Sequence, residues 1–369
     1  MLRVLHSVSN MDRAGIETML MNYYRHIDRS QLQFDFIVNK PKPGDYDDEI
    51  RAMGGHIYQS PGLNPLHYPQ YLRFVQQVAA QDKDIKILHA HNEAMGLYAL
   101  NGARKAGLKV RIAHAHNTCI IRDYKWPLKM FCKQFLASSA TDLWSCGRDA
   151  GIYFFGKKNW EERGMILHNA IEPSTFRYDP VVRARMRAQY GLANQPVLGH
   201  VGRFNVQKNH ARLLDIFAQF LRLEPDAMLV LIGTGELEEP TRTKAQELGI
   251  AEHILFAGLQ SNMANWYQMM DLFVMPSLFE GLPVVGIEAQ AAGLGCLFSD
   301  AVPDEVLLSD QSVCFPLHAT DEDWAAEIHR LLQQHPDRTK GVGTICRAGY
   351  DINTEAMRLQ ELYLRMSQR

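Results

Sequence analysis

The chain has 369 residues, with 39 lysines and arginines against 41 aspartates and glutamates, so its formal net charge is −2. Hydrophobic residues make up 46% and charged residues 22%, which excludes a disordered or fibrous protein as the main description. At about 100–200 residues per domain, the length suggests two or three domains. The balanced charge gives no global field that would attract nucleic acid, so an anionic ligand must meet a local group of cations.

The cysteines and the apolar segments indicate the compartment. None of the six cysteines forms a CxxC pair, which argues against a zinc ribbon or a disulfide framework. The first residues read as a strand rather than a signal peptide, and no apolar run reaches the roughly 18–20 residues that span a bilayer. We therefore expect a cytoplasmic protein.

Short β-rich apolar runs alternate with segments that have apolar residues at helical spacing. In the first half, the predicted strands are 3–7, 34–39, 85–90, 111–114 and 142–145. In the second half, they are 197–201, 227–232, 253–256, 271–275 and 295–298. The predicted helices include 16–26, 69–80, 211–223, 240–248, 283–292 and a last helix at 354–366.

This alternation predicts βαβ units, parallel sheets and an α/β fold with two Rossmann-like, doubly wound domains that face each other across a ligand cleft. The proline-containing segment 168–180 is the predicted linker between the domains. Ligands of such sheets bind beyond the carboxyl ends of the strands, so the residues that follow each strand are the candidates for function.

The densest chemical signal is the segment MPSLFEGLPVVGIEAQAAG at 275–293. A predicted strand ends at its start, Gly281 allows a close approach of the backbone to a ligand, and Pro283 suits a first helical turn. Glu280 and Glu288 are placed to accept hydrogen bonds from the hydroxyl groups of one elongated ligand. The alternative is that both glutamates are ordinary surface residues.

Two cations follow the strand at 197–201. Arg203 and Lys208 fall at a strand-to-helix junction, where the helix dipole disfavours positive charge unless an anion is bound there. Arginine grips phosphate with two N–H groups and lysine supplies a point charge, so a diphosphate fits. The alternative is that both side chains are solvated.

Three glycine-containing turns after other strands are weaker signals. Gly233 and Gly235 form only a fragment of a dinucleotide fingerprint, which argues against an NAD site and is compatible with a turn against a nucleotide. Phe256 and Gly258 form another strand end, and Gly15 at the start of the first helix is suited to admit a phosphate.

The sequence HAHN occurs twice, at 89–92 and 114–117, each time after an apolar strand. Two HxH pairs are compatible with a metal centre. Because side chains alternate between the two faces of a strand, and because a usable metal site needs carboxylates nearby, we instead interpret these histidines as polar contacts to a ligand. We expect no metal site.

A basic, aromatic segment covers 120–135. Arg122, Lys125, Lys129 and Lys133 alternate there with Trp126, Met130, Phe131 and Phe135. Such a segment can lie on an anionic membrane surface. An ordinary amphipathic helix with its apolar face in the core explains it equally well.

The sequence resembles the retaining "group 1" glycosyltransferases of GT-B architecture, the type found in bacterial capsule and exopolysaccharide synthesis. The resemblance is carried by Glu280–Glu288 with EGLP, GRF…K at 202–208, GTGE at 233–236 and the Gly15 turn. The resemblance implies an acceptor-side domain of residues 1–170 with a crossover helix at 352–369, and a donor-binding domain of residues 171–351. One departure is Ala14, where many members carry a second glycine.

The resemblance also implies roles for single residues. Arg203 and Lys208 would neutralise the leaving diphosphate without a metal ion, Glu288 would bind the ribose, and His116 would lie near the transferred sugar. The remaining donor contacts would come from Gly15, Gly233, Gly235, Phe256, Gly258, Phe279, Glu280, Gly281, Leu282 and Pro283.

The resulting hypothesis is an enzyme without a cofactor that transfers a hexose or N-acetylhexosamine from a nucleoside-diphosphate sugar, in particular a UDP-sugar, to a saccharide or lipid-linked saccharide at the inner face of the cytoplasmic membrane. Three alternatives stay open: a glycoside hydrolase that uses Glu280 and Glu288, a noncatalytic nucleotide-sugar-binding protein, and a metal hydrolase built on the HAHN pairs.

Overall fold

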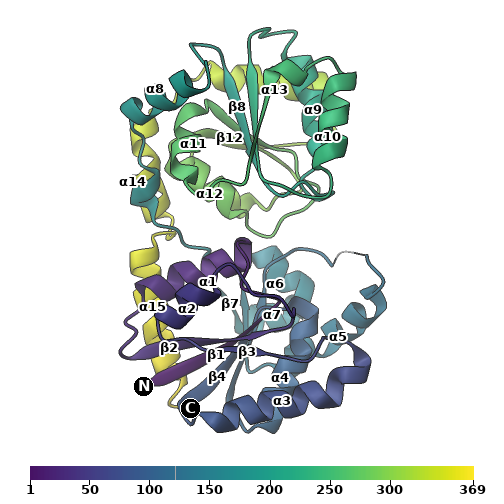
Figure 1. Cartoon of the computed structure of the whole chain (residues 1–369), viewed down its shortest axis with the longest axis vertical. Helices are drawn as coiled ribbons and strands as arrows, with labels where there is room; N and C mark the ends of the chain where they lie inside the picture. Colours follow the sequence, from purple (N-terminus) through teal and green to yellow (C-terminus); the bar gives the residue numbers. More distant parts are fainter. Residues whose placement is uncertain (121) are drawn as a thin grey trace. The chain divides into compact units, whose positions relative to one another are not determined.

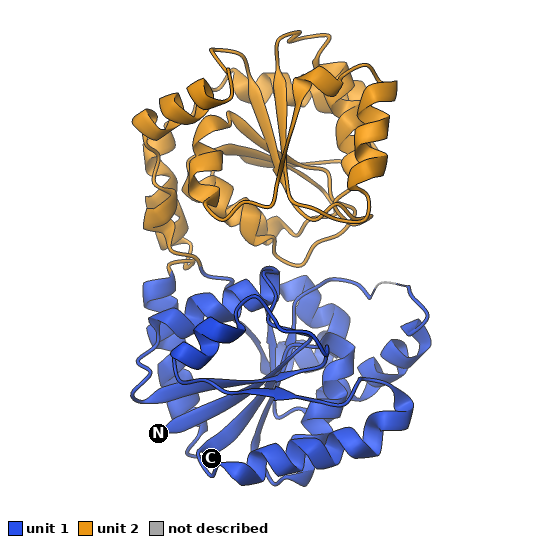
Figure 2. Cartoon of the chain, in the orientation of Figure 1, with its two compact units in different colours: residues 1–170, 352–369 blue, residues 171–351 orange. Residues whose placement is uncertain are grey.

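The computed structural model describes residues 1–120 and 122–369. The chain forms two compact units, shown in different colours in Figure 2. Unit 1 comprises Met1–Ala170 together with Ile352–Arg369, and unit 2 comprises Ile171–Asp351. Each unit contains one parallel sheet with helices on both faces (Figure 1).

Unit 1 is built on a seven-stranded sheet in the order β3-β2-β1-β4-β5-β6-β7. Its strands are β1 (Leu2–Val8), β2 (Leu32–Val38), β3 (Ile57–Gln59), β4 (Ile85–Ala90), β5 (Val110–Ala115), β6 (Asp142–Ser145) and β7 (Gly164–Ile166). Its α-helices are α1 (Gly15–His26), α2 (Asp47–Ala52), α3 (Tyr68–Gln81), α4 (Leu97–Lys105), α5 (Trp126–Ser139), α6 (Arg148–Phe155), α7 (Lys157–Arg163) and α15 (Ile352–Met366).

Strands β1 and β2 of unit 1 are buried along their whole length, as expected for a parallel sheet that is covered on both faces. In Figure 1, α1 and α2 lie on one side of this sheet and α3 and α4 on the other. Alternate residues of β1 and β2, among them Val4, Phe34 and Phe36, pack with α1 and α15 into one hydrophobic core. Tyr363 of α15 is fully buried in it, so the last helix belongs to unit 1 through its packing.

Unit 2 is built on a six-stranded sheet in the order β10-β9-β8-β11-β12-β13. Its strands are β8 (Val197–Val201), β9 (Met228–Ile232), β10 (Ile254–Gly258), β11 (Leu272–Met275), β12 (Gly295–Ser299) and β13 (Ser312–Phe315). Its α-helices are α8 (Pro180–Gln189), α9 (His210–Phe220), α10 (Glu238–Glu247), α11 (Met263–Met269), α12 (Val284–Ala291), α13 (Asp321–Leu332) and α14 (Gly341–Arg347). In Figure 1, α9, α10 and α13 cover one face of this sheet and α11 and α12 the other.

The predicted α/β fold with two parallel sheets is confirmed, and a strand forms at each of the ten predicted positions. Three further strands, β3, β7 and β13, lie at sheet edges and have only three or four residues. β3 and β7, with three residues each, are too short to carry a periodic signal. β13 is as long as the predicted β6 and β11, but most of its residues are only half-buried. The expected linker 168–180 also contains a short 3₁₀-helix at Pro173–Phe176.

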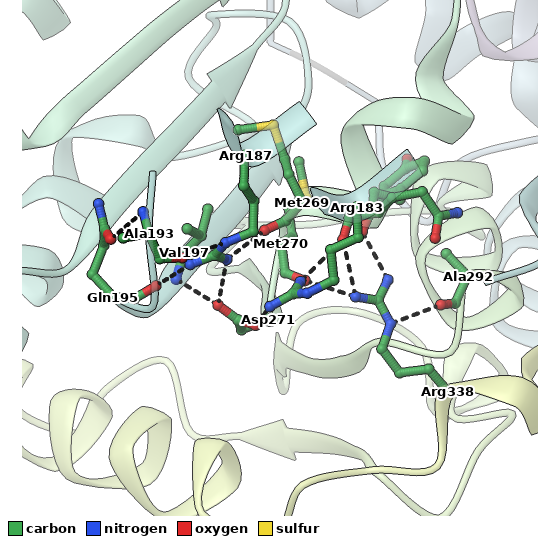
Figure 3. A network of polar contacts seen from close by, with 12 residues as sticks. Arg183, Arg187, Ala193, Gln195, Val197, Met269, Met270, Asp271, Ala292 and Arg338 are labelled. Carbon is green, nitrogen blue, oxygen red and sulfur yellow. Dashed lines mark hydrogen bonds and ion pairs between the residues drawn. The ribbon is translucent and has the colours of Figure 1, made fainter. Parts of the chain in front are cut away.

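A network of arginines holds α8 and the segment before α14 against the start of β11 (Figure 3). Arg183 and Arg187 of α8 both contact the carboxylate of Asp271, at 2.6 and 3.2 Å. Arg183 and Arg338 donate to the carbonyl oxygens of Gln268 and Met270 at the end of α11. The guanidinium groups therefore satisfy carbonyls that a helix end leaves without partners.

We expect Asp271→Ala to destabilise unit 2 by about 1–3 kcal/mol, because it leaves two guanidinium groups without a counter-charge. It also removes the acceptor of the Val197 N–H, which lies 2.8 Å from the carboxylate. Denaturant unfolding of the full chain measures the loss. Asp226→Ala, at an exposed position of the same unit, is the control, and an equal loss in both variants would show that the network contributes nothing specific.

Candidate functional site at the carboxyl ends of the strands

Each sheet has one point at which the strand order reverses direction. In unit 1 the chain runs from β1 outward to β3 and then returns to β4 on the other side of β1; in unit 2 it does the same around β8 and β11. The crossover connections leave in opposite directions there, and ligands of doubly wound sheets bind at such points. The candidate residues are therefore those that follow β1 and β4 within unit 1 and those that follow β8 and β11 within unit 2.

In unit 2 the reversal point holds a buried ion pair. Lys208, which follows β8, lies 2.7 Å from Glu280, which follows β11, and the two side chains are only 14% and 7% exposed. Gln207 donates to the other carboxylate oxygen of Glu280 at 3.1 Å and to the carbonyl of Phe279 at 3.0 Å. The fold thus brings together Lys208 and Glu280, two residues that were predicted for the site from separate motifs.

The glycines that follow β9 make room for the loop that follows β8. A Cβ atom on Gly233 would lie 2.1 Å from the carbonyl oxygen of Gly202, and one on Gly235 would lie 2.4 Å from that of Phe204. Backbone hydrogen bonds join the two loops, from Phe204 N–H to Thr234 and from Leu237 N–H to Phe204. Gly233 and Gly235 are therefore explained by the contact between these loops.

The side chain of Arg203 extends from the same loop toward solvent. It is 70% exposed and lies 3.1 Å from Glu236. Arg203 and Lys208 follow the same strand, but only Lys208 is enclosed by the protein. A guanidinium with this freedom can still reach an anion above the loop.

Glu288 lies in α12, whose first turn follows Pro283. Its carboxylate accepts a hydrogen bond from Tyr267 of α11 at 2.9 Å. Burial raises the pKa of Glu288 to about 7, and the hydrogen bond from Tyr267 opposes this shift. Leu282 is buried and Gly281 adjoins Glu280, so the whole EGLP segment packs into the unit beside the ion pair.

The strand end predicted to line a nucleobase is also formed. Gly258 has φ +65°, a left-handed conformation that favours glycine, and its carbonyl accepts the N–H of Gly233. Phe256 packs against the core of unit 2, with the guanidinium of Arg242 4.0 Å from the centre of its ring. Leu259 is exposed, so what this strand end offers a ligand is backbone and the side chain of Leu259 rather than the Phe256 ring.

In unit 1, Gly15 is the first residue of α1, and a Cβ atom there would meet nothing within 4 Å. The space in front of this helix start is open, as expected for a residue that admits a ligand. Next to it, Ser7 of β1 donates to Asn92 at 2.6 Å across the reversal point.

The histidines of the two HAHN motifs lie on one face of the unit 1 sheet together with His6 of β1, and all five side chains are buried. His6 is paired with His89 in the sheet register, and β4 and β5 carry the others. Our interpretation of all four HAHN histidines as ligand contacts is wrong for His89, His91 and His114, which bond to other buried rings. Residues two positions apart in a strand point to the same face, so the histidines of β1, β4 and β5 and of the residues just after them lie side by side on one face of the sheet.

Two groups of three of these histidines have nitrogen atoms within 4.8 Å of one another: His6 with His89 and His91, and His91 with His114 and His116. Each group contains two rings that lie close together, with centres 4.1 Å apart and planes inclined by 34° for His89–His91, and 4.0 Å and 29° for His114–His116. The expectation that these histidines hold no metal stays a prediction.

The basic segment forms α5, and Ile121 at its start lies outside the described residues. Its lysines have partners within the unit: Lys129 pairs with Asp123 at 2.8 Å, and the ammonium of Lys133 lies 3.6 Å from the centre of the Tyr153 ring. The large apolar side chains that are exposed here are Tyr124, Phe131 and Phe135, and the cation Arg122 is exposed as well. Across the described residues, no helix is long and apolar enough to cross a membrane.

Known proteins resemble this chain over its whole length. HepE of Anabaena, solved in complex with UDP, superimposes with a TM-score of 0.81 at 15% identity, covering 99% of this chain and 100% of that one. The protein EpsF of Bacillus subtilis (strain 168) is 34% identical over 372 residues, which cover 98% of this chain and 96% of EpsF. A UDP-Gal:α-D-GlcNAc-diphosphoundecaprenol α-1,3-galactosyltransferase of Escherichia coli is 24% identical over 369 residues, covering 96% of this chain and 94% of that enzyme.

The fold is therefore the GT-B architecture of glycosyltransferases. The family model for glycosyl transferases group 1 matches residues 182–341, which lie within unit 2 and include the Lys208–Glu280 pair. With EpsF similar over nearly the entire chain, the protein belongs to the group 1 glycosyltransferase family.

Two residues of the site were not predicted from the sequence. Gln207 joins the loops after β8 and β11, and Tyr267 holds Glu288 from α11. Gln207 is next to Lys208 in the chain, so its position was a weak signal. Tyr267 is 21 residues from Glu288, and nothing in the local pattern distinguishes it from an ordinary core tyrosine.

The raised pKa of Glu288 predicts a pH dependence of stability. The unfolded carboxyl ionises near pH 4.5 and the folded one near pH 7, so this group's contribution is fully present below pH 4.5 and is lost as the pH rises through 7. Relative to Glu288→Gln, which cannot ionise, we expect the unfolding free energy of the natural protein to fall by about 1–3 kcal/mol between pH 5 and pH 8.

Denaturant titrations of both proteins at the two pH values measure this difference. Glu17 of unit 1 also has a pKa raised to about 7 by burial, but it is present in both proteins and cancels. A pH-independent difference would show that Glu288 is ionised throughout this range.

Proposed function

We propose that this glycosyltransferase moves a hexosyl or N-acetylhexosaminyl group from a UDP-sugar to a saccharide acceptor, with retention at the anomeric carbon and without a metal ion. The observation that carries the proposal is the buried Lys208–Glu280 pair at the reversal point of unit 2. The ammonium provides positive charge for the leaving diphosphate, and the carboxylate provides acceptors for the hydroxyls of the sugar.

The surroundings of the ion pair support this division of roles. Charge that develops on the leaving β-phosphate is stabilised by Lys208, by the exposed guanidinium of Arg203 and by the N–H groups at the start of α12. Glu280, together with the backbone from Phe279 to Pro283, holds the sugar. Glu288, oriented by Tyr267, binds the ribose, and the backbone around Gly258 lines the base.

Unit 1 supplies the acceptor side in this proposal. Gly15 leaves space for a phosphate in front of α1, and His116, the outermost of the five stacked histidines, contacts the transferred sugar. The polysaccharide-related names of relatives, such as the capsular polysaccharide biosynthesis glycosyltransferase CapH of Staphylococcus aureus at 23% identity, support a role in bacterial surface polysaccharide synthesis.

A lipid-linked acceptor is the finer part of the proposal. It is supported by the exposed rings of Tyr124, Phe131 and Phe135 on and beside α5, because aromatic rings favour the membrane interface. The E. coli relative is named for a diphosphoundecaprenol-linked acceptor. On this basis the protein acts at the inner face of the cytoplasmic membrane.

We expect Lys208→Ala to lower kcat by about 10²–10³-fold, the size of effect seen when one donor that stabilises a developing anion is removed. Release of UDP from UDP-glucose, UDP-galactose and UDP-N-acetylglucosamine, with and without a glycolipid acceptor, measures turnover. Lys244→Ala is the matched control, since Lys244 also forms an ion pair in unit 2, with Asp215 at 2.6 Å.

A thermal-shift panel accompanies this experiment. UDP is expected to raise the melting temperature in the natural protein, whereas GDP and ADP are not, because only a ligand of the folded state stabilises it. Natural turnover in the Lys208→Ala variant would contradict the proposed site, and stabilisation by GDP alone would contradict the choice of UDP.

For the membrane contact, we expect the double variant Phe131→Ser/Phe135→Ser to lose most of its binding to vesicles that contain anionic phospholipid. The two rings are neighbours, with centres 5.1 Å apart, and both are exposed. Vesicle flotation measures binding. Met357→Ser on α15, which removes an exposed apolar side chain elsewhere on unit 1, is the control, and unchanged flotation of the double variant would exclude α5 as the contact.

A further inference from the structure

The five buried histidines of unit 1 form two separate hydrogen-bonded chains. In the first, Nδ1 of His6 lies 3.0 Å from Nε2 of His91, and Nδ1 of His91 lies 3.0 Å from Nε2 of His116. In the second, His89 bonds to His114 at 3.1 Å and to the hydroxyl of Tyr363 at 2.6 Å. Only the first chain ends at His116.

The rings of the first chain are neutral. Burial lowers the pKa of His6 and of His116 to about 3, and that of His91 well below its ordinary value. A neutral imidazole has one N–H donor and one lone-pair acceptor. Both nitrogens of His91 are engaged, so it must donate on one side and accept on the other.

This requirement couples the three rings. If His91 donates from Nδ1 to His116, it accepts from Nδ1 of His6, and all three rings carry the proton on Nδ1. If His91 donates from Nε2 to His6, all three carry it on Nε2. A mixed state places two donors or two lone pairs face to face and loses a buried hydrogen bond, which is unfavourable because a buried polar group is left without a partner.

The inner end of the chain selects between the two states. Nε2 of His6 is buried and has no hydrogen-bond partner in the part of the chain that the structure describes. In the Nδ1–H state this atom is a bare acceptor, whereas in the Nε2–H state it is an N–H donor without an acceptor. Buried donors without partners are the rarer of the two in folded proteins, which favours the proton on Nδ1 throughout the chain.

We propose that His91, backed by His6, is a positioning residue that fixes the tautomer of His116, so that Nδ1 of His116 meets a ligand as an N–H donor. Within residues 1–120 and 122–369, the hydrogen bond of His116 uses Nε2, so Nδ1 has no partner there. The ligand is a hydroxyl oxygen of the transferred sugar; this consequence rests on the proposed function, whereas the coupling of the rings does not.

The coupling is tested without substrate. In the full chain labelled with ¹⁵N-histidine, long-range ¹H–¹⁵N correlation spectra distinguish the two neutral tautomers, and single substitutions assign the peaks. We expect His6, His91 and His116 all to be protonated on Nδ1. Different tautomers among His6, His91 and His116 would overturn the coupling, and protonation of all three on Nε2 would overturn the assignment of Nδ1 of His116 as a donor.

Two matched variants test the role in turnover. His91→Phe and His89→Phe change the same residue type two positions apart, and each removes two ring hydrogen bonds, but only His91 is bonded to His116. In His91→Phe we expect both tautomers of His116, a fall in kcat of about tenfold, and a donor KM within about twofold of the natural value. His89→Phe is expected to leave the His116 tautomer unchanged and kcat within about twofold.

Two further measurements complete the test. His91→Gln, which offers both a donor and an acceptor, is expected to restore part of kcat, and equal losses of kcat in the two phenylalanine variants would reduce His91 to a structural role. Addition of Zn²⁺ must leave the histidine spectra unchanged, because a joint shift of three rings would make the cluster a metal site. Coupled tautomers in a protein that turns over no nucleotide sugar would contradict the proposed function while the coupling stands.

Discussion

The organisation of both units depends on one constraint: the strands of a parallel sheet all end at the same edge. At the point where the strand order reverses, the connections leave two neighbouring strands in opposite directions, so no connection covers the ends of these two strands. At this point backbone and side-chain polar groups are close together and partly removed from water. Each unit satisfies them differently: unit 2 uses opposite charges, Lys208 and Glu280, and unit 1 uses neutral imidazoles. The chemistry assigned to the two units follows from this difference.

The hydrogen-bond partners of a buried ion pair fix its position, and a new charge nearby changes its energy strongly because little water screens it. The carboxylate of Glu280 already has two neighbours that donate to it, Lys208 and Gln207, so it does not depend on the lysine alone. In the proposed reaction, the diphosphate would therefore compete for Lys208 without leaving Glu280 unsatisfied. The histidine rings of unit 1 are neutral, so what differs between their states is which ring nitrogen carries the proton. That choice decides whether a ring donates or accepts a hydrogen bond, which matters for binding a hydroxyl group.

Most of the fold could be predicted from the sequence because the central strands are long apolar runs separated by helical periodicity. The α/β class and the strand positions depend on such local signals, whereas β3 and β7 are too short to give one and β13 is mostly half-buried. For the site, the motif EGLPVVGIE and the cations after β8 were sufficient to name Glu280 and Lys208. Their direct contact, 72 residues apart, follows from sheet topology and not from spacing. For His89, His91 and His114 the interpretation as ligand contacts was wrong, because the sequence shows that they follow strand ends but not that their rings bond to other buried rings; the role of His116 stays a prediction.

The contact between the loops after β8 and β9 has a consequence for how this protein can be altered. Gly233 and Gly235 lie against the backbone of Gly202 and Phe204, so neither loop has room to change length or to gain a side chain at these positions while the other stays as it is. Diversification of this part of the donor side by insertion, in evolution or in the laboratory, must therefore treat the two loops as one unit. The loop after β10 begins with the exposed Leu259, and we expect it to be the freer place for variation.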